Sequence, residues 1–281
     1  MRYKYSKIDI NKLKMLINVI LNHRKKNIEV NNKTKIYNFF NEKKKEMIKI
    51  RSESINLNVN NKILVIVSCH TQGKLRWNAI TSIMSHLLRI ENIDIVIVNS
   101  SNLPFSDNIK NLYNEKCIKY MEIPNDNFYG FSKWYYALEN IDYNNYKFVT
   151  FINDSILVHS EITHFFDFTR FKNVDLFGYN DSNQNNYHYQ SYLFSIKKEC
   201  IDNFKKMYND YKHLIHSYND VINYYELNML KYFDSKDCFL KLTEIDSQNG
   251  KNIFFNNDNL YIQIRNQGYL PFTKLKRIKN Q

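Results

Sequence analysis

The spacing of hydrophobic residues changes along the chain, and the change marks where a sheet begins. From residue 63 the sequence Ile-Leu-Val-Ile-Val-Ser-Cys-His is apolar without a break until its polar end. An apolar run of this length is typical of a strand buried on both faces, as in the middle of a parallel sheet. Residues 93–101 repeat the pattern and end in Asn-Ser-Ser. We therefore expect two neighbouring central strands.

Helical spacing alternates with these runs. Apolar residues recur every three to four positions over residues 74–90, which predicts a helix between the two strands. A third strand is expected near 117–123, a helix from about Ser132 to Leu138 or beyond, and a fourth strand over 146–152. Strands that alternate with helices predict an α/β fold with a mostly parallel central sheet flanked by helices.

The pattern loosens after residue 155 into a mixed arrangement. Residues 175–179 and 189–196 read as strands, and 201–208 and 221–232 read as helices. We find no internal repeat, so the second half is predicted to complete the same domain.

Two amphipathic helices are predicted before the sheet, at about residues 13–21 and 36–47. We assign residues 1–58 to an N-terminal helical extension and residues 59–281 to the main domain. The polar faces of these helices are rich in Lys and Asn, which suits packing against the main domain or contact with an anionic membrane surface.

Composition narrows the class of protein. The 281 residues suffice for one large α/β domain with a helical appendage, so we expect one site. The four cysteines are far apart and form no CxxC pair, which argues against a zinc site or a disulfide framework. The N-terminal residues lack the features of a signal peptide, and no segment approaches a membrane span. We expect a cytoplasmic protein, with peripheral membrane contact as the alternative.

The formal net charge of +12 favours anionic partners, which include nucleic acid, anionic lipid and phosphate-bearing substrates. Charge alone does not choose among them. The aromatic residues fall mostly in apolar runs rather than between Lys and Arg, so no nucleic-acid partner is expected. A nucleic-acid-binding protein remains the alternative from another functional class.

Familiar catalytic motifs are absent: there is no GxGxxG, no GxxxxGK[ST], no HExxH and no GxSxG. Polar residues instead follow the predicted strands. Ligands of open α/β sheets bind beyond the carboxyl ends of the strands, so residues 68–73, 99–101 and 153–155 should converge. His70 and Gln72 are candidate contacts to the nucleotide of the donor, with an exposed loop as the alternative. Asn99 and Ser100 are expected first to hydrogen-bond the turn and second to contact the donor.

Asp154 is the candidate metal ligand because it follows a buried strand within Asn153-Asp154-Ser155. A carboxylate in that place can hold Mg²⁺ or Mn²⁺, and the ion can bridge the two phosphates of a nucleotide sugar. A turn or a helix cap is the alternative for this tripeptide.

Six separated blocks occur in one order: Asn-Phe-Tyr-Gly-Phe-Ser-Lys-Trp at 127–134, Phe-Ile-Asn-Asp-Ser at 151–155, Asp-Leu-Phe-Gly at 175–178, His-Tyr-Gln-Ser-Tyr-Leu at 188–193, Tyr-Glu-Leu at 225–227 and Leu-Pro-Phe-Thr-Lys at 270–274. Together they resemble the rhamnan synthesis F family of glycosyltransferases, which builds rhamnose-containing surface polysaccharides. The resemblance spans residues 63 to about 276. The chain departs from the family pattern at Tyr129, where the family tends to carry Asp, and this leaves the donor sugar open.

The resemblance implies a GT-A-like fold and a nucleotide-sugar-dependent glycosyltransferase of the hexosyltransferase type. The acceptor would be a polysaccharide, a glycan or a lipid-linked glycan. Asp154 would bind Mn²⁺ or Mg²⁺ with the diphosphate, assisted by Asn153 and Ser155. The residues implied to line the sugar or acceptor pocket are His188, Gln190 and Ser191.

Glu226 is the candidate general base, because an acceptor hydroxyl must lose a proton as it attacks the anomeric carbon. Attack opposite the diphosphate would invert that centre. Asp181 and Asp175 are the rival bases, because both lie in a segment that should overhang the site. A catalytically inactive sugar-binding relative is a further alternative.

Overall fold

The structure is a computed structural model of the chain that describes residues 34–50, 52–53, 61–101, 104–126, 128–245, 262, 264–266 and 268–276. It divides into two units, Met1–Glu46 and Met47–Gln281. Residues 34–46 of the first unit are helical, and the helix continues to residue 50 in the second. The second predicted N-terminal helix is thus confirmed, whereas the first one and the proposed boundary at residue 59 lie outside the described residues. None of the described helices combines the length and apolar character that crossing a membrane requires.

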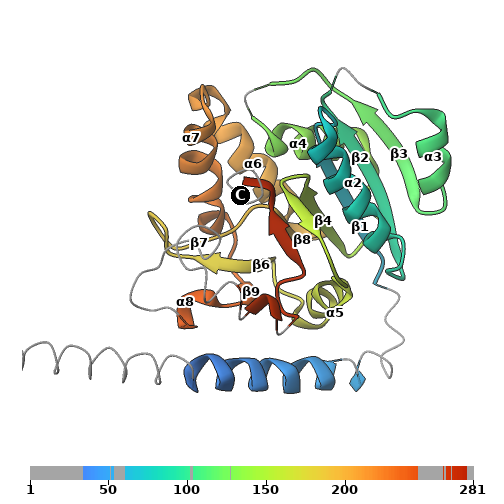
Figure 1. The fold of residues 1–281 in the computed structure, drawn as a ribbon. Coiled ribbons are helices and arrows are strands. Elements are labelled where there is room, and N and C mark those ends of the chain that lie inside the picture. Colours follow the sequence, from blue (N-terminus) through green and yellow to red (C-terminus); the bar gives the residue numbers. More distant parts are fainter. Residues whose placement is uncertain are drawn as a thin grey trace, which may run out of the picture. The chain divides into compact units, whose positions relative to one another are not determined.

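An eight-stranded mixed sheet forms the centre of the second unit (Figure 1). Its order is β3-β2-β1-β4-β8-β6-β7, and β9 pairs with the free side of β6. The strands β3, β2, β1 and β4 are mutually parallel, which confirms the α/β prediction. The bounds are β1 (Ile63–Cys69), β2 (Ile93–Asn99), β3 (Cys117–Glu122), β4 (Phe148–Asn153), β6 (Leu176–Ser182), β7 (His188–Tyr189), β8 (Leu193–Lys197) and β9 (Lys236–Leu240).

The second half of the sheet differs from the prediction. The region expected as one strand over 189–196 is two strands, β7 and β8, separated by residues 190–192. β8 runs antiparallel to both β4 and β6, so β6 is parallel to β4. A small second sheet pairs β5 (Ile156–Val158) with β10 (Phe272–Lys274), and this pairing brings the C-terminal region back to the end of β4.

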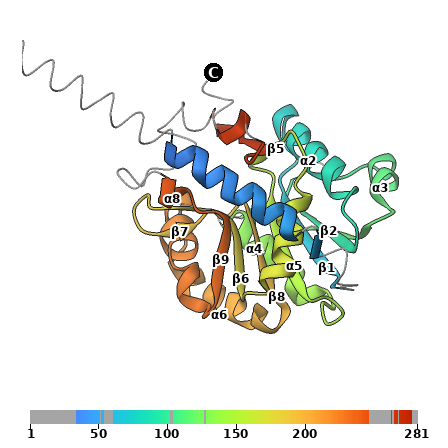
Figure 2. The ribbon, with the colours of Figure 1, turned by 90° about the horizontal axis from the view of Figure 1, so that it is seen from below.

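Helices cover both faces of the sheet (Figures 1 and 2). On one face, Trp134 of α4 and Phe204 of α6 pack with Phe151 of β4 and Phe194 of β8 in a shared aromatic core. The other face carries α2 and α5, as Figure 2 shows. The helix bounds are α2 (Lys74–Leu87), α3 (Asp107–Tyr113), α4 (Gly130–Asn140), α5 (Thr163–Lys172), α6 (Ile201–Tyr211), α7 (Tyr218–Asp220) and α8 (Leu242–Ile245).

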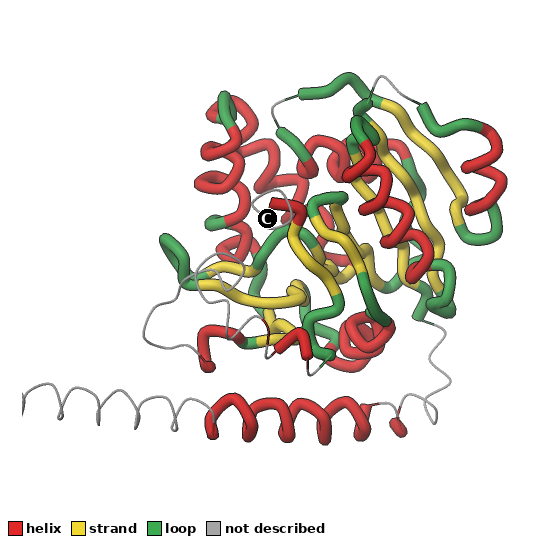
Figure 3. The backbone as a smooth tube through the Cα atoms, in the orientation of Figure 1, coloured by secondary structure: helices red, strands yellow, loops and turns green. Residues whose placement is uncertain are grey.

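The helix expected over 221–232 is present but irregular. Figure 3 draws most of this segment as helix. After α7 the chain forms a π-helical turn over Val221–Glu226 and then a 3₁₀ turn over Met229–Tyr232. Such π-helical turns often occur at functional sites, because they re-aim the side chains around them. Glu226 is the last residue of this turn.

Candidate functional site

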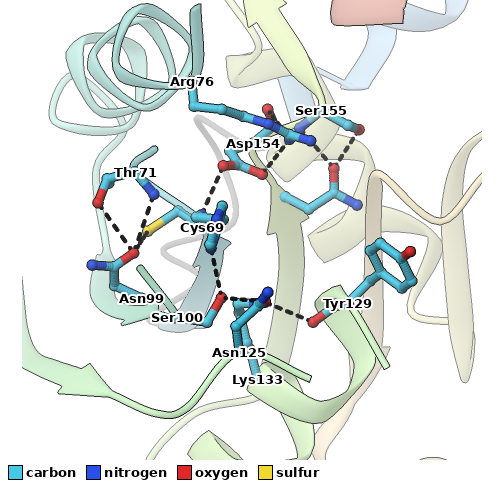
Figure 4. A network of polar contacts seen from close by, with 12 residues as sticks. Cys69, Thr71, Arg76, Asn99, Ser100, Asn125, Tyr129, Lys133, Asp154 and Ser155 are labelled. Carbon is cyan, nitrogen blue, oxygen red and sulfur yellow. Dashed lines mark hydrogen bonds and ion pairs between the residues drawn. The ribbon is translucent and has the colours of Figure 1, made fainter. Parts of the chain in front are cut away.

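The polar ends of three parallel strands lie at one edge of the sheet, as the sequence predicts. Cys69 of β1 is level with Asn99 of β2, and Ser68 is level with Asn153 of β4. The loops that follow β1, β2 and β4 therefore start beside one another. Figure 4 shows the polar contacts that join them.

Asn99 joins the loops after β1 and β2. Its buried side-chain oxygen Oδ1 accepts hydrogen bonds from the Thr71 and Ser101 backbone N–H groups, at 3.3 and 3.2 Å, and from the Thr71 hydroxyl at 3.3 Å. These contacts use the amide to fix loop geometry. Asn99 thus has the turn-forming role that the sequence analysis expected first, ahead of donor contact.

Ser100 and His70 continue this network toward the surface. The hydroxyl Oγ of Ser100 lies 3.2 Å from His70 Nδ1 and donates to Asn125 Oδ1 at 3.3 Å. The other ring nitrogen of His70, Nε2, lies 2.9 Å from Gln72 Oε1. His70 is partly exposed and Gln72 is exposed, so both remain placed to meet a ligand.

Asp154 is buried, with 6% of its surface exposed, and both of its carboxylate oxygens are engaged. Oδ1 accepts a hydrogen bond from Arg76 Nη1 at 2.7 Å, and Oδ2 accepts one from the His70 backbone N–H at 2.8 Å. Arg76 Nη1 also donates to the Asp154 carbonyl at 2.9 Å. Burial raises the pKa of the Asp154 carboxyl, and the Arg76 charge opposes that rise. Figure 4 shows Arg76 reaching from α2 to this carboxylate.

Lys133 places a second cation close by. It is almost fully buried in the first turn of α4, where its Nζ donates to the Tyr129 carbonyl at 2.8 Å (Figure 4). Burial lowers the pKa of Lys133, and the charges of Asp126 and Asp154 oppose the fall. Tyr129 itself has φ 55° and ψ −118°, a backbone conformation that residues other than glycine rarely adopt.

Asn153 and Ser155 support the strand end. The Asn153 side-chain oxygen accepts from both the backbone N–H and the hydroxyl of Ser155. The Asn153 backbone N–H donates to the Tyr192 carbonyl at 3.2 Å, and its Nδ2 donates to the Ser191 carbonyl at 3.5 Å. Asn153 thus connects the Asp154 region to the turn between β7 and β8.

That turn belongs to a second polar cluster, which we call the Glu226 cluster: His188, Gln190, Ser191, Glu226 and Lys274. Glu226 Oε1 accepts from the Ser191 backbone N–H at 3.3 Å and lies 3.7 Å from His188 Nε2. Gln190 lies between two other members, because its Nε2 is 2.9 Å from His188 Nε2 and its Oε1 accepts from Lys274 Nζ at 2.7 Å. The structure therefore brings together four of the residues that the sequence singled out.

The hydrogen bonds of this cluster suggest one protonation pattern. His188 Nδ1 lies 2.8 Å from the Asn186 carbonyl, which can only accept, so Nδ1 carries the proton. His188 Nε2 then accepts from the Gln190 amide. Within the described part of the chain, both contacts of Glu226 use Oε1. Its other oxygen, Oε2, can therefore meet a ligand.

Tyr218 of α7 connects the two parts of the site. Its ring lies edge-on to the Tyr129 ring, with centroids 5.1 Å apart, and Lys276 Nζ lies 4.8 Å from its centroid. Burial raises the pKa of Tyr218; the charge of Glu226 adds to the rise and that of Arg76 opposes it. The charges of Arg76 and Glu226 thus both act on the Tyr218 hydroxyl group.

The rival bases have other surroundings. Asp181 accepts from the Thr243 backbone N–H at 3.1 Å and from its hydroxyl at 2.6 Å, contacts that hold the start of α8. Asp175 precedes β6 and accepts from the Ser235 backbone N–H at 2.9 Å. Because β6 is parallel to β4, Asp175 lies at the amino-end edge of the sheet, opposite the site. The prediction that Asp175 overhangs the site is wrong.

The predicted metal site gains no support from this geometry. Mg²⁺ and Mn²⁺ are held by oxygen ligands, for Mg²⁺ usually one or two carboxylates together with waters and substrate phosphates. Within the described part of the chain, no three or more His, Cys, Asp and Glu residues are grouped to hold a metal ion. Both oxygens of Asp154 already accept hydrogen bonds, one of them from a cation. The residues present therefore do not fit a bound divalent ion, and Asp154 as a metal ligand stays a prediction from the sequence.

Arg76, Lys133 and Tyr218 were missed by the sequence analysis, which had considered Lys274 only as part of a basic stretch able to pair with a diphosphate or a lipid phosphate. Arg76 offered the clearest signal, because a basic residue in the first turn of a helix that follows a central strand lies at the ligand-binding edge of an α/β sheet. Lys274 ends the last of the family-like blocks, and its position beside Gln190 depends on the β5–β10 pairing.

No family model and no curated protein matches this chain. Solved structures resemble it in fold. The galactosyltransferase LgtC, in complex with donor and acceptor sugar analogues, is 14% identical, with 75% of this chain and 86% of that chain covered and a TM-score of 0.45. The mannosyltransferase PcManGT from Pyrobaculum calidifontis, with GDP-Man and Mn²⁺, is 12% identical, with coverages of 50% and 46% and a TM-score of 0.36.

A 4-diphosphocytidyl-2C-methyl-D-erythritol synthase from Anaerococcus prevotii is 10% identical, with 64% of this chain and 86% of that chain covered and a TM-score of 0.40. At this level of likeness the three structures say nothing about the reaction of the present chain. What the chain does has to be inferred from its own site.

Proposed function

We propose that the chain transfers a glycosyl group from a nucleotide diphosphate sugar to a hydroxyl group of an acceptor glycan. One observation carries the proposal. At the carboxyl edge of the sheet, the partly exposed guanidinium of Arg76 is bound to Asp154, and the carboxylate of Glu226 accepts from Ser191, whose carbonyl accepts from Asn153 beside Asp154. A cation for a departing diphosphate and a base for an attacking hydroxyl are the two groups that such a transfer requires.

The chemistry assigns one role to each group. Glu226 Oε2 takes the proton of the acceptor hydroxyl while that oxygen forms a bond to the anomeric carbon. The bond from the anomeric carbon to the diphosphate oxygen breaks, and the nucleoside diphosphate leaves with the electron pair. Attack from the side opposite the leaving group inverts the anomeric centre, and no covalent enzyme intermediate is needed.

The contacts around Glu226 suit a base. Its Oε1 is held by the Ser191 backbone N–H, which fixes the orientation of the carboxylate. His188 and Gln190 are buried beside it and are placed to contact a sugar hydroxyl group or to support the groups that do. Asp181 serves α8 through Thr243, so we favour Glu226 over Asp181 as the base.

The finer assignments rest on the resemblance to the rhamnan synthesis F family. They are a GT-A-like hexosyltransferase, rhamnose as the donor sugar, and a surface polysaccharide, glycan or lipid-linked glycan as the acceptor. Mn²⁺ or Mg²⁺ on Asp154 belongs to the same set. The proposed reaction uses no metal ion, because the residues around Asp154 do not fit one. Contact with an anionic membrane is likewise carried by sequence alone.

A turnover assay tests the proposal. The full chain is incubated with a panel of UDP-, GDP-, CDP- and dTDP-linked sugars, and release of the nucleotide is measured with and without oligosaccharide acceptors. We expect release from one donor or a narrow set of donors, accelerated by an acceptor. If no nucleotide sugar is consumed and none stabilises the chain against heating, the chain is not a nucleotide-sugar enzyme. Stabilisation without turnover would instead support the inactive sugar-binding relative.

A further inference from the structure

The charges around Asp154 are mainly positive. Besides Arg76, the nearby groups that act on its pKa include Lys133 and His70, and all of them favour the ionised carboxylate. The carboxylate already accepts from Arg76 and from a backbone N–H, and Asn153 Oδ1 is occupied by Ser155. A divalent cation placed here would have to displace these donors and sit beside two positive side chains, which costs electrostatic free energy.

Arg76 has the opposite character, because it can still take a ligand. Both of its described hydrogen bonds use Nη1, and 39% of its side chain is exposed. A guanidinium carries five N–H donors in a rigid fork, so Nε and Nη2 remain for another partner. That fork matches two oxygens of a phosphate group, which a lysine cannot reproduce.

Two further cations approach from the C-terminal segment. Lys276 Nζ lies 4.8 Å from the centroid of the Tyr218 ring, which lies edge-on to the Tyr129 ring at the start of α4. Lys274 Nζ lies 4.9 Å from the Tyr192 centroid and donates to Gln190 of the Glu226 cluster. The site between Asp154 and the Glu226 cluster is therefore bordered by three positive side chains from two distant parts of the sequence.

We infer that the site binds the diphosphate of the donor directly on Arg76, with Lys274 and Lys276 alongside and without a bridging divalent cation. Asp154 is then a positioning residue that aims the guanidinium rather than a metal ligand. The inference rests on the proposed function and specifies how the leaving group is neutralised. A purely structural role for the Arg76–Asp154 pair accounts for the hydrogen bonds of Arg76 Nη1 but not for the exposure of the rest of the guanidinium.

Binding of inorganic pyrophosphate, UDP, GDP, CDP and dTDP to the full chain tests this inference. Each probe is titrated by calorimetry in EDTA and again with MnCl₂. We expect pyrophosphate and at least one nucleoside diphosphate to bind in EDTA, with dissociation constants that change by less than about threefold when Mn²⁺ is added, a difference well under 1.4 kcal/mol. Arg76→Ala and Arg76→Lys should each weaken binding by about 10- to 100-fold, because a charge-assisted bidentate contact is lost. Arg89→Ala, at an exposed arginine just after the same helix, is the matched control and should bind as the unaltered chain does.

Asp154→Asn separates positioning from metal binding. The amide can still accept from Arg76 but lacks the charge, so pyrophosphate binding in EDTA should weaken severalfold and stay independent of Mn²⁺. The Nε–H resonance of Arg76, identified by its absence in Arg76→Lys, should shift when pyrophosphate is added in EDTA. If the Arg76–Asp154 pair only supports the fold, pyrophosphate should not shift that resonance. The melting temperature of each variant shows whether weaker binding is due to unfolding.

The outcomes separate the two claims. Binding that appears with Mn²⁺ and vanishes in EDTA overturns the metal-free site while leaving the glycosyltransferase proposal in force. Binding that survives Arg76→Ala unchanged also overturns it. If no diphosphate binds under either condition, both claims are wrong.

Discussion

Glu226 and Lys274 contribute opposite charges to one cluster, and each can be tested by itself. Gln190 contacts both Lys274 and His188, and the charge of Glu226 acts on the pKa of Lys274. Substituting Glu226 should mainly change the turnover rate, and substituting Lys274 should mainly change donor binding.

Glu226→Gln keeps the size and the Ser191 contact of the side chain but removes the basic oxygen. We expect nucleotide affinity to stay within a few-fold and the turnover rate to fall by about 10²–10⁴-fold, the usual contribution of a placed general base. Steady-state assays with the donor found by turnover screening measure both quantities. Glu115→Gln, at an exposed position, is the control. A rate that survives Glu226→Gln would move the base elsewhere, with Asp181 the next residue to substitute.

Lys274 should give donor binding a pH dependence. Burial lowers its pKa from 10.5 to about 8, while Glu226 opposes the fall and Lys276 adds to it. In the folded chain Lys274 therefore loses its charge as the pH rises through about 8, and pyrophosphate binding should weaken above that pH.

The effect of rising pH on folding stability has the opposite sign to its effect on binding. Between about 8 and 10.5 the unfolded chain binds more protons at this position, so the contribution of Lys274 to folding stability rises with pH. Calorimetric titration of pyrophosphate from pH 7 to pH 10 measures the binding effect. Lys274→Arg should remove the fall in affinity, because a guanidinium keeps its charge over this range. Equal pH profiles for the two proteins would show that Lys274 does not titrate against the ligand.

At the scale of elements, the start of α4 is held in a strained conformation. Tyr129 has φ 55°, while its ring is 45% exposed and contacts Tyr218. Strain of this kind costs about 1–3 kcal/mol and persists where the surrounding structure enforces it, often at functional sites. The strained peptide also presents the carbonyl that accepts from Lys133.

Tyr129→Gly should release this strain. The released strain offsets two costs of about 0.5–1.5 kcal/mol each, the lost ring contact and the added freedom of the unfolded chain. We therefore expect the free energy of unfolding to change by less than about 1 kcal/mol. Tyr136→Gly is the matched control, since Tyr136 is 40% exposed but lies within α4. That control should lose about 1 kcal/mol from helix propensity alone. Urea denaturation compares the two, and equal losses would show that Tyr129 is unstrained.

The sequence predicted those elements whose burial is uniform. β1 is buried along its whole length, so its apolar run marks its bounds well. The predicted strand over 189–196 failed because the turn at 190–192 carries polar and aromatic residues that alternate much as a strand does. β5 and β10 are three residues each, too short to produce a pattern, and they pair across more than a hundred positions.

The same limit applies to the site. Asn153-Asp154-Ser155 was found because it ends a buried strand, but the partner of Asp154 lies 78 positions away in Arg76. Asp154 alone reads as a metal ligand; Asp154 beside a guanidinium reads as a positioning group. The role of a carboxylate depends on its partner. The sequence pattern predicts that Asp154 lies at the site but not that Arg76 is bound to it.

For the whole molecule, the net charge of +12 allows nucleic acid as a competing partner. The cations that border the site come from α2 and the C-terminal segment and are each tied to a carbonyl, an amide or a ring. We therefore expect weak binding of RNA and DNA that disappears at physiological salt. Filter binding over a range of salt concentrations measures this, and tight binding with a steep salt dependence would favour the nucleic-acid alternative.

The most direct measurement is an experimental structure of the chain with its donor nucleotide or an unreactive donor analogue bound. Our account predicts diphosphate oxygens within hydrogen-bonding distance of Arg76 Nε and Nη2, and an anomeric carbon facing Glu226 Oε2. A diphosphate bound elsewhere, or a divalent ion coordinated by Asp154 with Arg76 turned away, would contradict it.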